Sequence, residues 1–463
     1  MRGAQRPARE CAKRGALPSA RVRAVSQVAA LRRSTDPCVR LGAAGIKGPI
    51  IVAGGAGYVG SHTVKVLAAA EAASATPRRI VVVDNLESGH AAALPAGVEL
   101  VQLALDDCDA LVELFERLRP SAVIDFAAYL SVGDSQAIPE EYFRNNVRNF
   151  KNLLVACAAA GTKVIVKSST QATYGDICED DCPVAEDFNA AARFDAPTMH
   201  AGTLRGEAMD GPTLFATLMK EYADLAKPAG GKDTLDLSFT EEDVKRLHTP
   251  CSVYGWSKLV NEIMLAKLEA LNGTRWIALR YGNVCGADPD GEIGEAKPKP
   301  HTLMTLAIYS LLANMGEMPL DRYGVREVLK VFGTDYPTRD GTCVRDYVHP
   351  TDLAYAHVAS LQKLNNDDDC ESAAYNLGTQ TGSTVFEVLK ACEAAAGKEL
   401  RYTTEARRPG DAAQSVLDCR AAAAAIGYRT KFNLERMAAT AWRWHRGHID
   451  GFSDVGADAT PAS

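Results

Sequence analysis

The sequence lacks any apolar run approaching the roughly 20 residues that a helix needs to cross a bilayer, so we expect no transmembrane helix and no membrane partner. Its 12 cysteines include no CxxC pair and no Cys/His cluster with metal-ligand spacing, and the closest two are Cys178 and Cys182. This scatter argues against a disulfide framework and against a metal site. It favours free thiols in a reducing compartment.

Acidic residues outnumber basic ones outside the N-terminal segment. Residues 1–47 hold nine Arg and two Lys against Glu10 and Asp36, a formal charge of +9; since the whole chain carries −7, residues 48–463 carry −16. An acidic body argues against general nucleic-acid binding, which needs a basic surface. The basic, Ala- and Ser-rich segment has the composition of an organelle transit peptide, with a disordered extension or an over-long gene start as the alternative. We expect a plastid or mitochondrial location if it is a transit peptide, and a cytoplasmic one otherwise.

From Pro49 onward, apolar strand-like runs alternate with helical patterns. Strands are predicted at residues 50–53, 79–83, 122–126, 163–166 and 276–279, and helices at 61–70, 111–118, 146–160 and 254–271. This alternation predicts an α/β protein with a Rossmann-type, doubly wound parallel sheet. Ligands bind such sheets at the carboxyl ends of the strands, where Gly54, Asp84, Phe126 and Ser168 fall.

A glycine-rich turn follows the first strand. Gly54, Gly57 and Gly60 have the spacing GxxGxxG, which lets backbone N–H groups approach a pyrophosphate at the N-terminus of the next helix. Asp84 ends the next strand, where a carboxylate accepts hydrogen bonds from the adenosine ribose and repels a 2′-phosphate. NAD is therefore predicted over NADP. The alternative is a structural turn beside an unrelated aspartate.

Tyr254 and Lys258 lie one helical turn apart on the same predicted helix face. A neutral tyrosine is a poor base because its pKa is near ~10, but the lysine charge and that of a nicotinamide ring would stabilise the phenolate. Thr170, after the strand at 163–166, offers a hydroxyl to share the proton. The alternative is an ordinary helix with a partly buried tyrosine and a surface lysine.

Domain limits follow from these patterns. We expect an NAD-binding domain at residues 48–284, interrupted by a polar surface insertion at 189–248, a smaller α/β substrate-binding lobe at 285–452, and a disordered tail at 453–463. Inside the insertion, helices are predicted at 214–225 and 240–247, the second with a Thr240–Asp243 capping pair.

Longer motifs carry a family resemblance. These runs are GGAGYVGSHTV, VVVDNLESGH, FAAYLSVGDS, SSTQATYGD, YGWSK, ADPDGEIGE, VFGTDYPTRDGTCVRDYVH, YNLGTQTGSTV and ARRPGD. They resemble the extended short-chain dehydrogenase/reductase family and, within it, the UDP-sugar 4-epimerases of the UDP-glucose 4-epimerase type, over residues 48–187 and 249–452. The ATYGD run also resembles the plant-type UDP-xylose (UDP-arabinose) 4-epimerases.

The resemblance implies an NAD-dependent isomerase of nucleotide-sugar and galactose metabolism. It would interconvert UDP-glucose and UDP-galactose through a transient 4-keto sugar and NADH, with Tyr254 as base, Lys258 tuning it and Thr170 as its partner. A homodimer is implied too. The implied cofactor residues are Gly54, Gly57, Tyr58, Val59, Gly60, Asp84, Asn85, Phe126, Ala127, Ala128, Asn145, Ser168, Tyr254, Lys258 and Tyr281. The implied substrate residues are Thr170, Asn283, Leu303, Arg345, Arg408, Asp411 and Ser415.

Several positions depart from the family pattern. Leu130 stands where a lysine often helps to bind NAD, and Leu105 where an aspartate holds the adenine, so Asp106 or Asp107 would substitute. Gly282 replaces a phenylalanine, and Ser252-Val253 replace Asn-Pro before the catalytic tyrosine. The small Ser415, at what resembles a gate beside the sugar, predicts some tolerance of N-acetylated sugars.

Four alternatives stand beside UDP-glucose 4-epimerisation. Related 4,6-dehydratases carry Thr-Asp-Glu, and related decarboxylases a glutamate, where this chain has Thr170-Gln171-Ala172. Without a carboxylic acid there, elimination lacks its proton donor. UDP-xylose/UDP-arabinose epimerisation is the closest alternative. A non-catalytic NAD-binding sensor or scaffold is the alternative of another class.

Overall fold

The computed structural model describes residues 48–175, 177, 181–187, 202–204, 207–209, 211–239, 250–297, 302–319, 327–408 and 411–452. All of them belong to one compact unit, Lys47–Ser463. The predictions for residues 1–47, for the helix at 240–247 with its Thr240–Asp243 cap, and for the tail at 453–463 fall outside the described residues.

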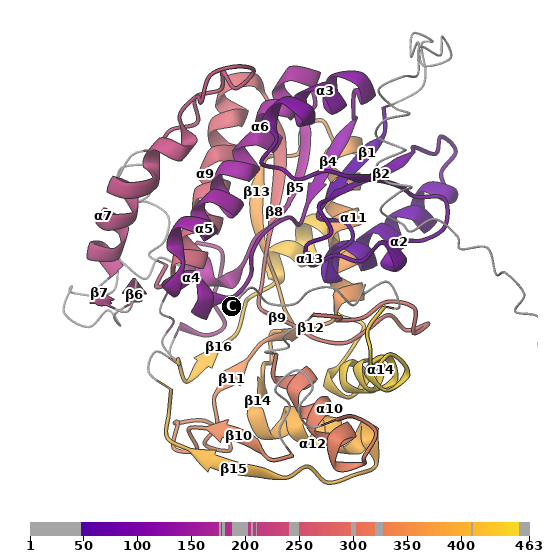
Figure 1. Cartoon of the computed structure of the whole chain (residues 1–463), viewed down its shortest axis with the longest axis vertical. Coiled ribbons are helices and arrows are strands. Elements are labelled where there is room, and N and C mark those ends of the chain that lie inside the picture. The colour runs from indigo at the N-terminus through magenta and orange to yellow at the C-terminus, as the bar shows by residue number, and fades with distance from the viewer. Residues whose placement is uncertain are drawn as a thin grey trace, which may run out of the picture. The chain divides into compact units, whose positions relative to one another are not determined.

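A seven-stranded sheet, parallel throughout, forms the centre of the fold (Figure 1). Its strand order is β13-β8-β5-β4-β1-β2-β3. The strands are β1 (Ile50–Ala53), β2 (Ile80–Asp84), β3 (Glu99–Gln102), β4 (Ala122–Asp125), β5 (Val164–Ser168), β8 (Arg275–Tyr281) and β13 (Ala373–Leu377). Because the chain leaves β1 first toward β2 and β3 and then in the other direction, the sheet is doubly wound, which confirms the predicted fold class.

Side chains of each central strand alternate between two apolar cores. Ile50 and Val52 join one core with α2 (Tyr58–Ala72) and α11 (Pro350–Asn366). Ile51 joins the other core, with α3 (Cys108–Leu118), α6 (Asn149–Ala160) and α9 (Val253–Asn272). Strands that are buried on both faces read as continuous apolar runs, as the sequence of β1 does.

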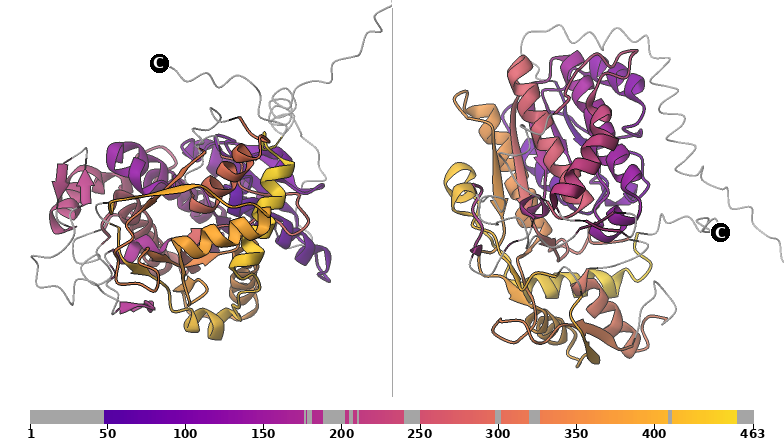
Figure 2. Two further views of the ribbon diagram at one scale, coloured as in Figure 1. Left: turned by 90° about the horizontal axis from the view of Figure 1, so that it is seen from below. Right: turned by 90° about the vertical axis from the view of Figure 1, so that its left-hand side faces the viewer.

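A third core holds the smaller lobe together (Figure 2). It joins helices α10 (Leu303–Asn314), α12 (Val385–Ala396) and α14 (Leu434–Gly447) to the strand pair β10 (Leu329–Phe332) and β15 (Tyr402–Glu405). Two smaller sheets connect the lobes: β9 (Asn283–Val284) with β12 (Tyr347–Val348), and β11 (Val344–Arg345) between β14 (Ser383–Thr384) and β16 (Gln414–Ser415). Among the described helices, none has the combination of length and apolar character that crossing a bilayer requires.

The chain returns to the large sheet after building part of the smaller lobe. Helix α11 and strand β13 lie beyond the predicted boundary at 284/285, yet α11 covers the sheet and β13 forms its edge beside β8. The predicted domains are therefore not two consecutive stretches of sequence in this structure. No strand was predicted at 373–377, and local patterns do not indicate which sheet a strand joins.

The described part of the insertion packs on the α6–α9 face (Figure 1). It contains the hairpin β6 (Gly202–Leu204) and β7 (Glu207–Met209), helix α7 (Gly211–Tyr222) and the 3₁₀ turn η7 (Ala223–Ala226). Tyr222 stacks on Phe143 with ring centroids 4.7 Å apart. Buried Lys151 donates to Asp233 Oδ1 at 2.7 Å and to the Lys227 carbonyl at 2.7 Å. The insertion is thus tied into the core by apolar contacts and a buried ion pair.

Candidate active site

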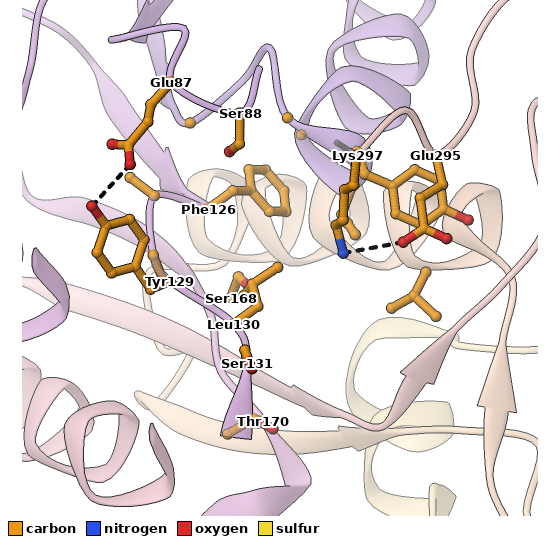
Figure 3. A pocket seen from close by; sticks show the side chains of 18 of the residues that line it. Glu87, Ser88, Phe126, Tyr129, Leu130, Ser131, Ser168, Thr170, Glu295 and Lys297 are labelled. Atoms are coloured by element: carbon orange, nitrogen blue, oxygen red, sulfur yellow. Dashed lines mark hydrogen bonds and ion pairs between the residues drawn. The ribbon is translucent and has the colours of Figure 1, made fainter. Parts of the chain in front are cut away.

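A cavity of about 920 Å³ lies at the carboxyl ends of the central strands. Its walls come from the glycine turn, from the ends of β2, β4, β5 and β8, from the first turn of α9, and from residues 294–297 and 302–304 of the smaller lobe. Figure 3 shows part of this wall, with Glu87 and Tyr129 on one side of Phe126, and Glu295 and Lys297 on the other. This is the edge at which the sequence predicts ligand binding.

The glycine turn leaves no room for side chains on its inner surface. Gly54 has φ +68°, and a Cβ atom there would lie 2.6 Å from the Ala127 nitrogen. A Cβ at Gly60 would lie 2.3 Å from the Gly54 carbonyl oxygen. Helix α2 begins at Tyr58 with no acidic residue in its first turn, so its positive N-terminus is available to an anion in the cavity. These features fit the diphosphate of a dinucleotide.

Asp84 is fixed at the end of β2. Its Oδ2 accepts the Ala56 N–H at 3.0 Å, its Oδ1 accepts the Leu86 N–H at 2.8 Å, and burial raises its pKa. Each carboxylate oxygen keeps a lone pair for a ribose hydroxyl. Of the two predicted substitutes for an acid at Leu105, Asp106 lines the cavity, whereas Asp107 caps α3 by accepting the Ala110 N–H at 3.0 Å.

Helix α9 places Tyr254 in the cavity wall. Ser252 caps the helix, its Oγ accepting the Gly255 N–H at 3.0 Å, which gives the unusual Ser252-Val253 lead-in a structural role. The Tyr254 N–H donates to Ser135 Oγ at 3.1 Å. Burial raises the pKa of Tyr254 to about 12, against the opposing effect of the neighbouring Thr170 side chain.

Lys258 lies behind this wall, almost fully buried. Its Nζ donates to the Ser168 carbonyl at 3.2 Å and lies 5.9 Å from the Tyr254 ring centroid. Burial lowers the pKa of Lys258 well below its usual value, with a further contribution from the charge of Lys167. Burial thus acts against the charged form of both Tyr254 and Lys258, and a positive charge in the cavity would favour the tyrosinate.

The predicted cofactor residues come together in this structure. Lys258 lies behind the wall, and all the others line the cavity. These are Gly54, Gly57, Tyr58, Val59, Gly60, Asp84, Asn85, Phe126, Ala127, Ala128, Asn145, Ser168, Tyr254 and Tyr281. Tyr281 shares a 2.5 Å hydrogen bond with Ser168 Oγ, so β8 and β5 hold one continuous wall beside Tyr254.

The predicted substrate residues divide into two groups. Thr170, Asn283, Leu303 and Arg408 line the cavity. The other three, Arg345, Asp411 and Ser415, lie outside the described lining. Arg345 donates a hydrogen bond to the Ala412 carbonyl at 2.8 Å and forms an ion pair with Asp411 at 3.4 Å. In the pairing of β11 with β16, Arg345 lies opposite Ser415. Arg345 would have to leave these partners to reach a diphosphate, and roles for all three residues stay predictions.

Several residues that line the cavity were not predicted from the sequence. Tyr129 donates to Glu87 at 3.0 Å, and Lys297 pairs with buried Glu295 at 3.1 Å. Lys297 lies two residues after the ADPDGEIGE run, a family-like motif that could have pointed to it. Leu130, where a lysine is usual in the family, is 49% exposed at the cavity.

Gln171 is a further lining residue that was not predicted to bind substrate. A Cβ at Gly282 would lie 2.8 Å from the Gln171 side chain, so Gln171 occupies the space that a larger residue at position 282 would need.

Comparisons with known proteins agree with this site. The model of the NAD dependent epimerase/dehydratase family matches residues 50–198 and 228–378. A UDP-glucose 4-epimerase of Lacticaseibacillus casei is 33% identical over 406 residues, covering 88% of this chain and 99% of that protein.

Two solved structures are also similar. One, a UDP-glucose 4-epimerase, has a TM-score of 0.67 at 30% identity and covers 88% of this chain and 99% of its own. The other, a UDP-glucose-4-epimerase of Stenotrophomonas maltophila with bound NAD and formylated UDP-arabinopyranose, has a TM-score of 0.66 at 30% identity and covers 87% and 99%. The glycine turn, the acid at the end of β2 and the Tyr–Lys helix thus occur in a chain that belongs to the NAD dependent epimerase/dehydratase family.

Proposed function

We propose that this protein is an NAD-dependent UDP-sugar 4-epimerase that interconverts UDP-glucose and UDP-galactose. The observation that supports this most directly is that Thr170 and Tyr254 line the same cavity as the glycine turn, with Lys258 directly behind them. A dinucleotide and a sugar hydroxyl can therefore meet beside one proton-transfer group. The relatives named above, all called UDP-glucose 4-epimerases, support the reaction.

NAD, when bound, would supply a group that takes hydride from the sugar C4 and returns it. Tyr254 would remove the proton of the 4-hydroxyl as C4 is oxidised and give it back after the ring has turned over, while the Thr170 hydroxyl holds the oxygen between them. Asp84 and the N-terminus of α2 would hold the dinucleotide. Arg408 would meet the UDP diphosphate.

Epimerisation is favoured over elimination because Ala172, at the cavity wall, offers no acid to protonate a leaving hydroxyl. UDP-xylose/UDP-arabinose epimerisation uses the same residues and is the second candidate. It is supported by the neighbour whose structure holds a UDP-arabinopyranose derivative.

A substrate panel tests the proposal. The full chain is incubated with UDP-galactose, UDP-arabinose and UDP-N-acetylgalactosamine, and the 4-epimers are separated by chromatography. We expect the greatest turnover on UDP-galactose. A greater rate on UDP-arabinose would select the second candidate, and retained NAD with no turnover of any sugar would select a sensor or scaffold.

We also infer a homodimer, on the family resemblance, and a transit function for residues 1–47, on their composition. The molar mass from light scattering tests the first. Import of a fluorescent protein fused to residues 1–47 into plastids or mitochondria tests the second, and a diffuse cytoplasmic signal would contradict it.

A further inference from the structure

A hydrogen bond from His90 joins the two lobes at the wall of the cavity. This residue follows β2 and precedes the 3₁₀ turn η2 (Ala91–Ala93), and its Nε2 lies 2.8 Å from the Ala296 carbonyl oxygen. Because a carbonyl oxygen can only accept, His90 Nε2 carries the proton and donates the hydrogen bond. The backbone N–H of His90 donates to the Ala56 carbonyl of the glycine turn at 2.9 Å. His90 therefore connects the glycine turn to the smaller lobe.

Phe452, in the segment after α14, packs against this contact. Its ring centroid lies 5.0 Å from that of His90 and 4.9 Å from that of Trp444. It lines the cavity although only 7% of its surface is exposed. Trp444 Nε1 donates to the Glu295 carbonyl at 3.2 Å, so two successive carbonyls of the wall are held, one by α14 and one by His90. We call His90, Glu295, Ala296, Trp444 and Phe452 the lobe junction.

The lobe junction is closely fitted. A Cβ at Gly294 would lie 2.2 Å from the Trp444 ring, so a glycine is needed for the wall to approach α14 this closely. Gly451 has φ +69°, and its N–H donates to the His448 carbonyl at 2.9 Å. This turn brings the chain back onto Trp444, on which His448 also stacks with ring centroids 3.8 Å apart. Phe452 is thus placed by a specific turn and by two neighbouring rings.

The lobe junction borders the part of the cavity that fits the dinucleotide. Figure 3 shows Glu87, from the loop after β2, and Glu295, from the smaller lobe, on opposite sides of Phe126. Asp84 and the glycine turn, which fit the ribose and the diphosphate, line the same cavity as His90. A dinucleotide held by them lies against a wall that both lobes build. Its release on this side requires the lobe junction to open.

We propose that His90 and Phe452 are positioning residues of the cofactor site, which keep the smaller lobe against the glycine turn and thereby slow the release of bound NAD. The hydrogen bond of His90 links the lobes, and the Phe452 ring holds His90 against the wall. The inference rests on the NAD binding of the proposed function. It does not depend on which sugar is bound or on whether that sugar reacts.

The release rate of NAD tests this directly. Wild type and variants loaded with radiolabelled NAD are mixed with excess unlabelled NAD, and the loss of bound label is followed. Phe452→Ala removes the ring, His90→Leu removes the donor, and His90→Gln keeps a side-chain N–H. The matched control is Phe432→Ala: Phe432 is a buried ring of the smaller lobe that stacks on His349 at 3.8 Å, outside the described lining. Unfolding midpoints are recorded for all variants.

We expect release to be about tenfold faster in Phe452→Ala and His90→Leu, the effect of one lost hydrogen bond, and to stay within about twofold of wild type in His90→Gln and Phe432→Ala. Wild-type release rates in both Phe452→Ala and His90→Leu, or an equal acceleration in Phe432→Ala, would overturn the inference. Wild-type turnover of UDP-galactose is measured alongside. Its absence would refute the proposed function, while the release rates would still report on the lobe junction.

Discussion

The side chain of Tyr254 lies beside that of Thr170, and both residues are buried in the cavity wall, with 8% and 5% of their surface exposed. Burial raises the pKa of Tyr254 to about 12 and lowers the pKa of Lys258 behind it. The protein without cofactor therefore holds its proton-transfer group in the protonated state at neutral pH. A bound cation beside Tyr254 would change that balance.

Loading with NAD⁺ should lower the pKa of Tyr254, because a positive nicotinamide ring stabilises the phenolate. Between about pH 7 and pH 10, we expect no tyrosinate from Tyr254 without the cofactor and a rising amount with it. Tyrosinate absorbance of the wild type minus that of Tyr254→Phe isolates this residue. The same difference titration with and without NAD⁺ would contradict the expectation.

Thr170→Val removes the hydroxyl and keeps the shape of the side chain. Because the Thr170 hydroxyl lowers the pKa of Tyr254, its loss should move the ascending limb of the pH–rate profile to higher pH and reduce kcat about tenfold or more. Thr173→Val is the matched control: Thr173 lies in the same 3₁₀ turn, and its hydroxyl donates to the Thr170 carbonyl at 2.9 Å. An alkaline shift in the control alone would refute a direct role for Thr170.

Arg408→Met should raise the KM for UDP-galactose about tenfold while kcat changes little, since Arg408 lines the cavity and would contact the diphosphate rather than C4. Arg407→Met is the control, because Arg407 lies outside the described lining and pairs with Asp335 at 2.8 Å on the surface. Steady-state kinetics of both variants decide the point. Equal KM values for the two would remove Arg408 from the substrate site.

Asp233→Leu should destabilise the fold by roughly 3–5 kcal/mol, because it leaves the fully buried Lys151 without its counter-ion. Adding Lys151→Met should recover part of this loss, since no unpaired buried charge then remains. Urea unfolding of the two variants and the wild type measures the differences. If Asp233→Leu unfolds at the wild-type urea concentration, the insertion is not anchored through this pair.

Much of the fold could be predicted because the relevant signals are local. The strand before Gly54 and the helix carrying Tyr254 and Lys258 follow from runs and periods of apolar residues, and the carboxyl-edge rule then brings the glycine turn, Asp84 and Thr170 to one cavity.

The remaining features depend on contacts between distant segments. Nothing local in residues 373–377 indicates that they pair with β8, and nothing in Asp233 indicates that it lies against Lys151. Nothing in Gln171 indicates that its side chain lies against Gly282, more than a hundred residues later. Polar residues in loops carry no periodic pattern, so their partners become visible only in the folded chain.

The central claim is that Tyr254 moves a proton in a reversible oxidation of UDP-sugars at C4. Its most direct measurement is the conversion of UDP-galactose to UDP-glucose by the NAD-loaded wild type and by Tyr254→Phe, with cofactor content and unfolding midpoint recorded for both. We predict turnover by the wild type and a loss of about 10²-fold or more in Tyr254→Phe, with retained NAD and an unchanged fold. A near-normal rate in Tyr254→Phe, or no conversion by the wild type, would contradict the claim.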